Sequence, residues 1–204
     1  MAISTQDIKQ LRDATGCGMM DCKRALEESS GNVDSAKEYL RKKGIAKAEK
    51  KSGRTTGEGA IGHYIHSNGK IGVLVEIRSE TDFVARSDDF QQLIKDVAMH
   101  IAAMNPLAVN EESFPKVVLA RERRIASESD EVLKKPEKIR PKIVEGKVKK
   151  FIKENALLNQ AFVKDQNITV DDRVKETAGK VGENIKVVRF VRIELGSETA
   201  SVVE

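Results

Sequence analysis

One glycine motif in this sequence has the spacing that phosphate binding requires. Gly57, Gly59 and Gly62 match the G-x-G-x-x-G pattern with which dinucleotide-binding folds approach a pyrophosphate. That use needs a strand before the glycines and a helix after them, so that the phosphate meets a helix N-terminus. Here a basic segment precedes the glycines and a strand pattern follows them. We therefore interpret the motif as a flexible junction between domains.

Side chains that ligate metals or act as nucleophiles are few and scattered. His63 and His66 lie three apart on a predicted strand, so they point to opposite faces of the sheet, and His100 falls in a predicted helix. Cys17 and Cys22 do not combine with the histidines at a zinc spacing, and no serine lies in a nucleophile elbow. We expect no catalytic activity, no metal and no cofactor.

The clearest candidate for a contact site lies in residues 79–90, where strand alternation gives way to helical periodicity. Phe83 stands at this boundary beside Asp82, in a chain with only 4% aromatic residues. A single phenylalanine is more often a core residue than a contact residue. However, the strand pattern ends by Ile77 and the apolar face of the next helix begins only at Phe90. Because Phe83 belongs to neither buried pattern, we predict that it is exposed.

The elements on the N-terminal side of this boundary are short helices. Residues 1–44 predict three of them, with a capping box at Ser4 and Asp7 and an end at Gly44. Helices of this length are not stable alone, so we expect them to pack as a small bundle. The predicted core positions, among which Met19 and Met20 are favoured as buried, are Ile8, Leu11, Met19, Met20, Cys22, Ala25, Leu26, Val33, Ala36 and Leu40.

A basic segment follows the predicted bundle. Between Arg41 and Arg54 lie seven basic residues and one acid, Glu49. Together with the glycines after it, this run predicts a linker over residues 45–58. A solvated hinge and an anion-binding patch explain its charge equally well.

Residues 59–196 predict a second domain of mixed structure. Two β-branched runs flank Asn68-Gly69, which is typical of a tight hairpin. A strong helix pattern begins at Phe90, after cap candidates at residues 87–89, and Pro106 ends it. Further helices are predicted at 116–129, after Pro136 and Pro141, and at 172–180; a third strand is predicted at 185–195 and a flexible tail at 197–204. This order indicates an α+β fold, in which the three-helix bundle precedes a three-stranded antiparallel sheet packed with helices.

The composition indicates a globular protein. The chain has 204 residues, a mean hydropathy of −0.43 and no apolar run near the ~18 residues of a membrane span. Its first residues lack the basic start and apolar core of a signal peptide. Two cysteines cannot staple a fold of this size, so we expect free thiols and a cytoplasmic protein. A net charge of +4 permits an acidic partner but does not require one.

Three parts of the chain together resemble the elongation factor Ts family. They are TGCGMMDCKRAL at 15–26 with LRKKG at 40–44, ETDFVAR at 80–86, and VEGKVKKF at 144–151 with LLNQAFVKD at 157–165. The resemblance spans nearly the whole chain in the family's order. It implies that residues 1–44 form a ubiquitin-associated-like three-helix domain. It also implies guanine-nucleotide exchange on elongation factor Tu, with GDP released so that GTP binds.

The same resemblance assigns a contact site. In the family, the segment matching Thr81, Asp82, Phe83 and Val84 disturbs the magnesium site of the GTPase, with the phenylalanine as a wedge and the aspartate as its polar neighbour. Two departures are notable. Ala161 replaces the family's usual proline, which implies a less rigid loop. Longer members also carry a duplicated core and an inserted coiled-coil hairpin, whereas this chain has one core unit, so a homodimer that supplies the second unit is a hypothesis.

Two other functions are consistent with parts of the sequence. A nucleic-acid-binding module on residues 41–54 would lose affinity steeply with salt, but aromatic residues for base stacking are scarce and acids are interleaved with the bases. An adaptor that uses the N-terminal bundle for ubiquitin-like ligands leaves residues 79–90 without a role. We therefore favour the exchange factor and expect neither nucleic acid nor a membrane as a direct partner.

Overall fold

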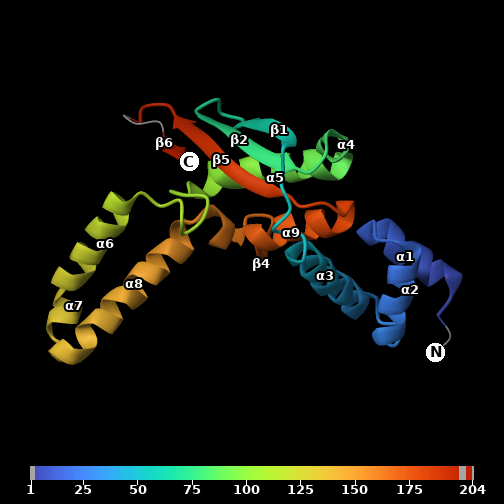
Figure 1. The fold of residues 1–204 in the computed structure, drawn as a ribbon, viewed down its shortest axis with the longest axis horizontal. Helices are drawn as coiled ribbons and strands as arrows, with labels where there is room; N and C mark the ends of the chain where they lie inside the picture. Colours follow the sequence, from blue (N-terminus) through green and yellow to red (C-terminus); the bar gives the residue numbers. More distant parts are fainter. Residues whose placement is uncertain (1–2, 198–200, 204) are drawn as a thin grey trace.

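The computed structural model describes residues 3–197 and 201–203 and has three parts: an N-terminal helical bundle, a sheet with helices beneath it, and a projecting helical hairpin (Figure 1). The bundle consists of α1 (Thr5–Thr15), α2 (Met19–Glu28) and α3 (Val33–Glu49). Ser4 and Asp7 form the predicted capping box, and Gly16 ends α1 with a φ of 66°, which favours glycine.

The core of the bundle is a small apolar cluster separate from the main one. Its buried members are Ile8, Leu11, Cys22, Ala25, Leu26, Ala36 and Leu40. The predictions that Met19, Met20 and Val33 are buried are wrong, because these residues are 41%, 71% and 37% exposed. Met19 and Met20 begin α2, and the face that α2 turns inward is formed by its smaller residues Cys22 and Ala25 together with Leu26.

The third helix does not end at Gly44 as predicted but continues to Glu49. Glycine disfavours a helix by only about 1 kcal/mol, and packing readily overcomes that preference. Here Ala48, beyond the glycine, is buried in the main core. The segment 45–58, predicted as a linker, therefore begins as helix, and the proposed domain division at residue 44 falls inside α3.

The main sheet is antiparallel with the strand order β1-β2-β5-β6. Its strands are β1 (Glu58–Ile65), β2 (Ile71–Ser79), β5 (Lys186–Glu194) and the short β6 (Ser201–Val203). The predicted α+β fold and its three main strands are confirmed. The prediction of a loose tail is wrong for residues 201–203, which pair with β5; residues 198–200 and 204 of that tail lie outside the described residues.

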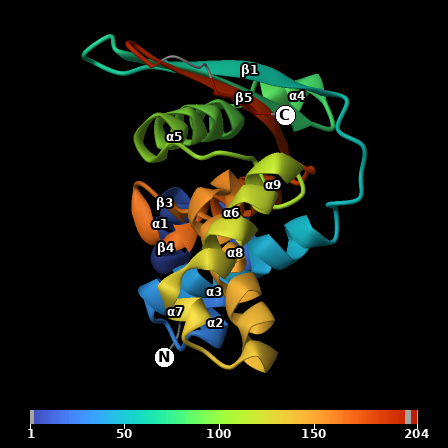
Figure 2. The same cartoon turned by 90° about the vertical axis from the view of Figure 1, so that its left-hand side faces the viewer.

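Helix α5 (Asp88–Met104) covers one face of this sheet (Figure 2). The apolar side chains of β2 that alternate toward it, Val73, Val75 and Ile77, are fully buried. Gly62 on β1 permits the close approach, because a β-carbon there would lie 1.7 Å from the Cγ2 atom of Ile94. Ser87 caps α5 as the sequence predicted.

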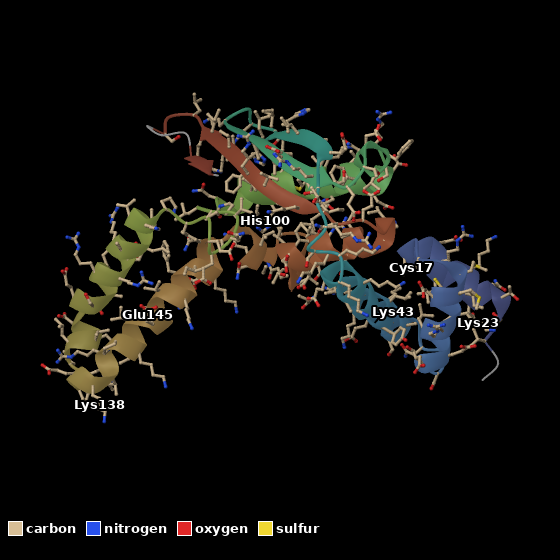
Figure 3. All side chains as sticks on the ribbon, in the orientation of Figure 1. Cys17, Lys23, Lys43, His100, Lys138 and Glu145 are labelled. Carbon is tan, nitrogen blue, oxygen red and sulfur yellow. The ribbon has the colours of Figure 1, made fainter. Side chains whose placement is uncertain are left out.

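A helical hairpin projects from this core (Figure 1). It comprises α6 (Lys116–Glu128), α7 (Asp130–Leu133), a 3-10 turn (Glu137–Ile139) and α8 (Arg140–Asn155). Lys138 lies at its tip, and Glu145 of α8 binds Arg123 of α6 at 3.0 Å (Figure 3). The sequence predicted α6 and α8 but not that they pair as a hairpin.

Helix α9 (Val170–Val181) connects the parts. It follows a 3-10 turn (Leu157–Asn159) and a two-stranded ribbon, β3 (Ala161–Phe162) and β4 (Asp165–Thr169), and it packs on both α5 and α3. The structure shows no helix long and apolar enough to span a bilayer among the residues it describes.

Candidate functional site

The four residues assigned to the contact site, 81–84, lie at a single helical turn between β2 and α5. The turn is α4 (Asp82–Ala85), and Thr81 caps it by accepting a hydrogen bond from the Val84 N–H at 3.4 Å. Phe83 points away from the molecule and is 81% exposed. The predicted exposure of Phe83 is confirmed.

The neighbours of Phe83 attach the turn to the fold. Val84 packs against the main core and Ala85 is buried in it. Asp82 pairs with Arg86 one turn later at 2.8 Å, in a contact that stays half-exposed and therefore contributes little to stability. The turn thus presents its aromatic ring outward while the next two residues anchor it.

The backbone carbonyls of the turn are also bonded to side chains. The Ser79 hydroxyl donates to the Thr81 carbonyl at 2.9 Å, and the Ser87 hydroxyl donates to the Val84 carbonyl at 2.7 Å. The side-chain amide of Gln91 donates to the Ala85 carbonyl at 2.7 Å. A one-turn helix is unstable by itself, so these contacts contribute to holding the turn.

Three further hydrogen bonds are accepted by a distant glutamate that was not predicted from the sequence. Glu183 Oε2 accepts hydrogen bonds from the backbone N–H groups of Glu80 and Thr81 at 3.1 and 3.0 Å. Glu183 Oε1 accepts one from the Thr81 hydroxyl at 2.7 Å. No local pattern distinguishes Glu183 from the other acids, because its partners lie about a hundred residues away in the chain.

A reciprocal contact joins the same two segments. Glu80 Oε1 accepts a hydrogen bond from the Asn184 N–H at 2.7 Å. The Asn184 side chain donates to the carbonyls of Ser52 and Arg54 at 3.1 and 2.8 Å. The corner between α9 and β5 therefore holds both the Phe83 turn and the segment that follows α3.

The N-terminal bundle is attached to the core along α3 and α9. Arg41 of α3 pairs with Glu176 of α9, and Lys175 of α9 pairs with Glu49 of α3 at 3.0 Å. The Lys51 ammonium donates to the carbonyl of Gly182, at the end of α9. The contact fixes where the bundle lies relative to the Phe83 turn.

The basic run at 41–54 is largely engaged within the molecule. Six of its seven basic side chains form an ion pair or a hydrogen bond within the chain. They are Arg41, Lys42, Lys43, Lys47, Lys51 and Arg54. Hydrogen bonds from Lys43 and Lys47 lower the pKa of Asp21 to about 2. These acidic partners offset part of the positive charge of the run, although Lys42, Lys47 and Arg54 remain exposed.

An exposed aromatic turn on a rigid support, carried by a fold of packed helices and an antiparallel sheet, is typical of a protein-interaction factor. Comparison with known proteins gives the family. The family model described as Elongation factor TS matches residues 6–197. The chain belongs to the elongation factor Ts family, whose members act in the elongation stage of protein biosynthesis.

Individual relatives match along nearly their full length. The chain is 52% identical over 200 residues to the Elongation factor Ts of Nitratidesulfovibrio vulgaris, covering 98% of this chain and 100% of that protein. It is 54% identical over 196 residues to the Elongation factor Ts of Synechococcus sp. (strain WH7803), covering 96% of this chain and 90% of that protein. The Elongation factor Ts of Fervidobacterium nodosum is 52% identical over 196 residues, covering 96% of this chain and 100% of that protein.

Proposed function

We propose that this protein is the guanine-nucleotide exchange factor of elongation factor Tu. It binds the GDP-bound GTPase in the cytoplasm and promotes release of GDP, so that GTP binds in its place. The observation that carries the proposal is the outward position of Phe83 on a turn held by Glu183 and by the core. Within the elongation factor Ts family, this turn matches the segment that disturbs the partner's magnesium site.

The proposed mechanism is a wedge. Phe83 enters between side chains of the GTPase and displaces the elements that hold the magnesium ion, while Thr81, Asp82 and Val84 border the contact. Burying an aromatic side chain of about 150–250 Å² at about 25 cal/mol per Å² stabilises a complex by at most about 4–6 kcal/mol. Half of that corresponds to a nearly hundredfold change in affinity, at about 1.4 kcal/mol per tenfold. Burial of one aromatic ring is therefore sufficient for much of the loss of GDP affinity that exchange requires.

Exchange of this kind needs no covalent chemistry. Factor and nucleotide compete through a coupling free energy, so a factor that weakens GDP binding is itself bound less tightly when GDP is present. The proposal accordingly assigns the protein no enzymatic step, no cofactor and no metal of its own. It also assigns it no direct contact with nucleic acid or with a membrane.

The N-terminal bundle is the second proposed contact. We expect residues 1–44 to dock on the GTPase domain, and the structure offers Met19 and Met20 on the exposed side of α2 for this purpose. Unbranched methionine side chains adapt readily to a partner surface. Because residue 44 lies inside α3, the test keeps the chain whole: Met19→Glu combined with Met20→Glu should weaken complex formation, which calorimetry with elongation factor Tu would measure.

The experiment that tests the function is a release measurement. Purified elongation factor Tu is loaded with a fluorescent GDP and mixed in a stopped-flow instrument with excess GDP, with or without this protein. We expect the rate of GDP release to rise with the concentration of this protein and to reach a plateau when elongation factor Tu is saturated. An unchanged release rate over micromolar factor concentrations would refute the proposal.

We also propose that the open face of the sheet binds a second copy of the chain. Ile61, Ile65, Leu74 and Ile193 are each more than half exposed there, and the strand register places Ile65, Gly72 and Ile193 in one row. Soluble monomers rarely leave such contiguous apolar surface uncovered. In longer family members a duplicated core unit lies within one chain, and a homodimer would supply the corresponding second unit here.

A further inference from the structure

The turn that carries Phe83 is bonded to one carboxylate from a distant part of the chain. Glu183 accepts three hydrogen bonds from two consecutive residues, Glu80 and Thr81, at distances of 2.7 to 3.1 Å. Hydrogen bonds to an ionised group are roughly twice as strong as neutral ones. Two backbone N–H groups and a half-buried hydroxyl would lose their partner without it, and each such loss is costly.

These bonds act at the start of the turn, where its direction is set. Thr81 is the capping residue of α4, and its hydroxyl, which donates to Glu183, also accepts the hydrogen bond from the Val84 N–H. Glu183 therefore holds the Thr81 hydroxyl that caps α4. The cap in turn stabilises the helical turn, which sets the direction of the Phe83 side chain. Glu183 itself is half-buried, and it accepts hydrogen bonds from Glu80 and Thr81.

The same corner also holds the chain that arrives from the bundle. Asn184 binds the carbonyls of Ser52 and Arg54, and the carbonyl of Gly182 accepts from Lys51. Three consecutive residues, 182–184, thus contact both the segment after α3 and the segment that carries Phe83. The two proposed contacts with the GTPase are held by one short loop.

We propose that Glu183 is a positioning residue for nucleotide exchange: it holds Phe83 in the direction in which the ring enters the partner. The inference rests on the proposed exchange function. Loss of the carboxylate leaves Phe83 present and exposed but frees the turn, while the N-terminal bundle still docks. The expected result is a lower release rate at saturation with little change in the concentration of factor that gives half the effect.

The test measures release of fluorescent GDP from elongation factor Tu against the concentration of full-length factor. Glu183→Ala should lower the saturating rate at least about tenfold, with the half-saturating concentration within about threefold of wild type. Glu183→Gln should keep much of the rate, because its amide oxygen still accepts the two N–H bonds and its NH2 group donates to the Thr81 hydroxyl. Glu154→Ala, which removes an exposed glutamate of α8, is the matched control and should exchange normally.

A double variant separates positioning from general destabilisation. If Glu183 acts through Phe83, adding Glu183→Ala to Phe83→Ala should slow release little further, because the two changes remove the same step. Hydrogen exchange of residues 80–84 should accelerate in Glu183→Ala and not in Glu154→Ala. Should Glu183→Ala fail to fold, Glu183→Asp replaces it. Its side chain is one methylene shorter and draws the carboxylate away from the N–H groups of Glu80 and Thr81, so a lower saturating rate is expected and a wild-type rate would overturn the inference.

The outcomes distinguish the two proposals. Normal release by Glu183→Ala beside slow release by Phe83→Ala would overturn the inference and leave the proposed function standing. Effects of Glu183→Ala and Phe83→Ala that multiply in the double variant would also overturn it. If the wild-type factor does not accelerate release, the proposed function is refuted, and the inference with it.

Discussion

Gly179 of α9 lies directly against the backbone of Gly44 of α3. A β-carbon added to Gly179 would stand 2.5 Å from the carbonyl oxygen of Gly44 and 2.8 Å from its Cα atom. Neither atom belongs to a flexible side chain, so the helices themselves would have to separate. The absence of a side chain at Gly179 is therefore what lets the bundle dock on the core.

Gly179→Ala should destabilise the protein, although alanine favours a helix over glycine by about 1 kcal/mol. Forcing two helix backbones apart typically costs about 1–3 kcal/mol, so we expect a net loss of stability. Urea denaturation, followed by circular dichroism, measures it. Gly44→Ala is the matched control, because a β-carbon there meets nothing within 4 Å. It should be neutral or stabilising, and equal losses in both variants would contradict the contact.

Phe83→Ala should leave the fold unchanged and slow nucleotide release. The side chain is 81% exposed, so its removal should change the free energy of unfolding by less than about 0.5 kcal/mol. The wedge mechanism predicts a release rate at least about tenfold lower. This corresponds to the loss of about 1.4 kcal/mol, which is well below the upper bound set by burial of the ring. Stopped-flow release and thermal unfolding of the same preparation check both parts. A wild-type release rate would rule out the wedge.

Stability should fall as the pH drops below about 6.5 because of His100. This residue is fully buried, and burial lowers its pKa. Its Nδ1 accepts from the Val163 N–H at 3.2 Å, so Nε2 carries the proton and donates to Gln160 at 3.0 Å. A second proton, on Nδ1, would point at the Val163 N–H, and the hydrogen bond between them would be lost. Asp96, one turn earlier on α5, is already engaged by Lys164 and Arg173.

The sign follows from which state binds the proton. Below pH 6.5 the unfolded chain protonates His100 while the folded chain does not, so stability declines by at most about 1.4 kcal/mol per pH unit until the folded pKa is reached. Urea unfolding at pH 8, 6.5 and 5.5 measures this slope. His100→Gln should be less stable at pH 8 but lack the slope. An identical slope in both proteins would assign the effect to other groups.

Leu74→Lys should convert the proposed homodimer into a monomer. A lysine at the centre of the open sheet face places a charge in the apolar contact, which is costly when unpaired. Light scattering at micromolar concentration should report the mass of two chains for wild type and of one for the variant. Val117→Lys, at an exposed aliphatic position on the hairpin, is the control and should remain dimeric. A monomeric wild-type protein would refute the homodimer.

Local patterns predicted most of the fold. The Asn68-Gly69 turn, the Ser4 and Ser87 caps and the periodic face of α5 are properties of short segments, and the structure confirms them. The exposure of Phe83 was also predictable, because it fits neither adjoining pattern. Such features depend on residues a few positions apart.

The short β3–β4 ribbon and α7 were missed although they are local, but the features that matter most for the candidate site depend on contacts with other parts of the fold. The Glu183 carboxylate and the Thr81 turn are 102 positions apart. The extension of α3 past Gly44 requires α9, and the pairing of α6 with α8 requires both helices at once. The exposure of Met19 and Met20 depends on which face of α2 its neighbours cover. A single sequence contains no local signal for any of these.

The continuity of α3 has a geometric consequence. Its first half contributes Ala36 and Leu40 to the bundle core, and its end contributes Ala48 to the main core. The helix has 17 residues, or about 25 Å at 1.5 Å per residue. Because one continuous helix belongs to both cores, no unstructured linker separates the bundle from the domain that carries Phe83. A protein that engages both the bundle and the Phe83 turn must therefore present two receptive regions in a matching arrangement, so geometry acts as a criterion of partner choice alongside surface chemistry.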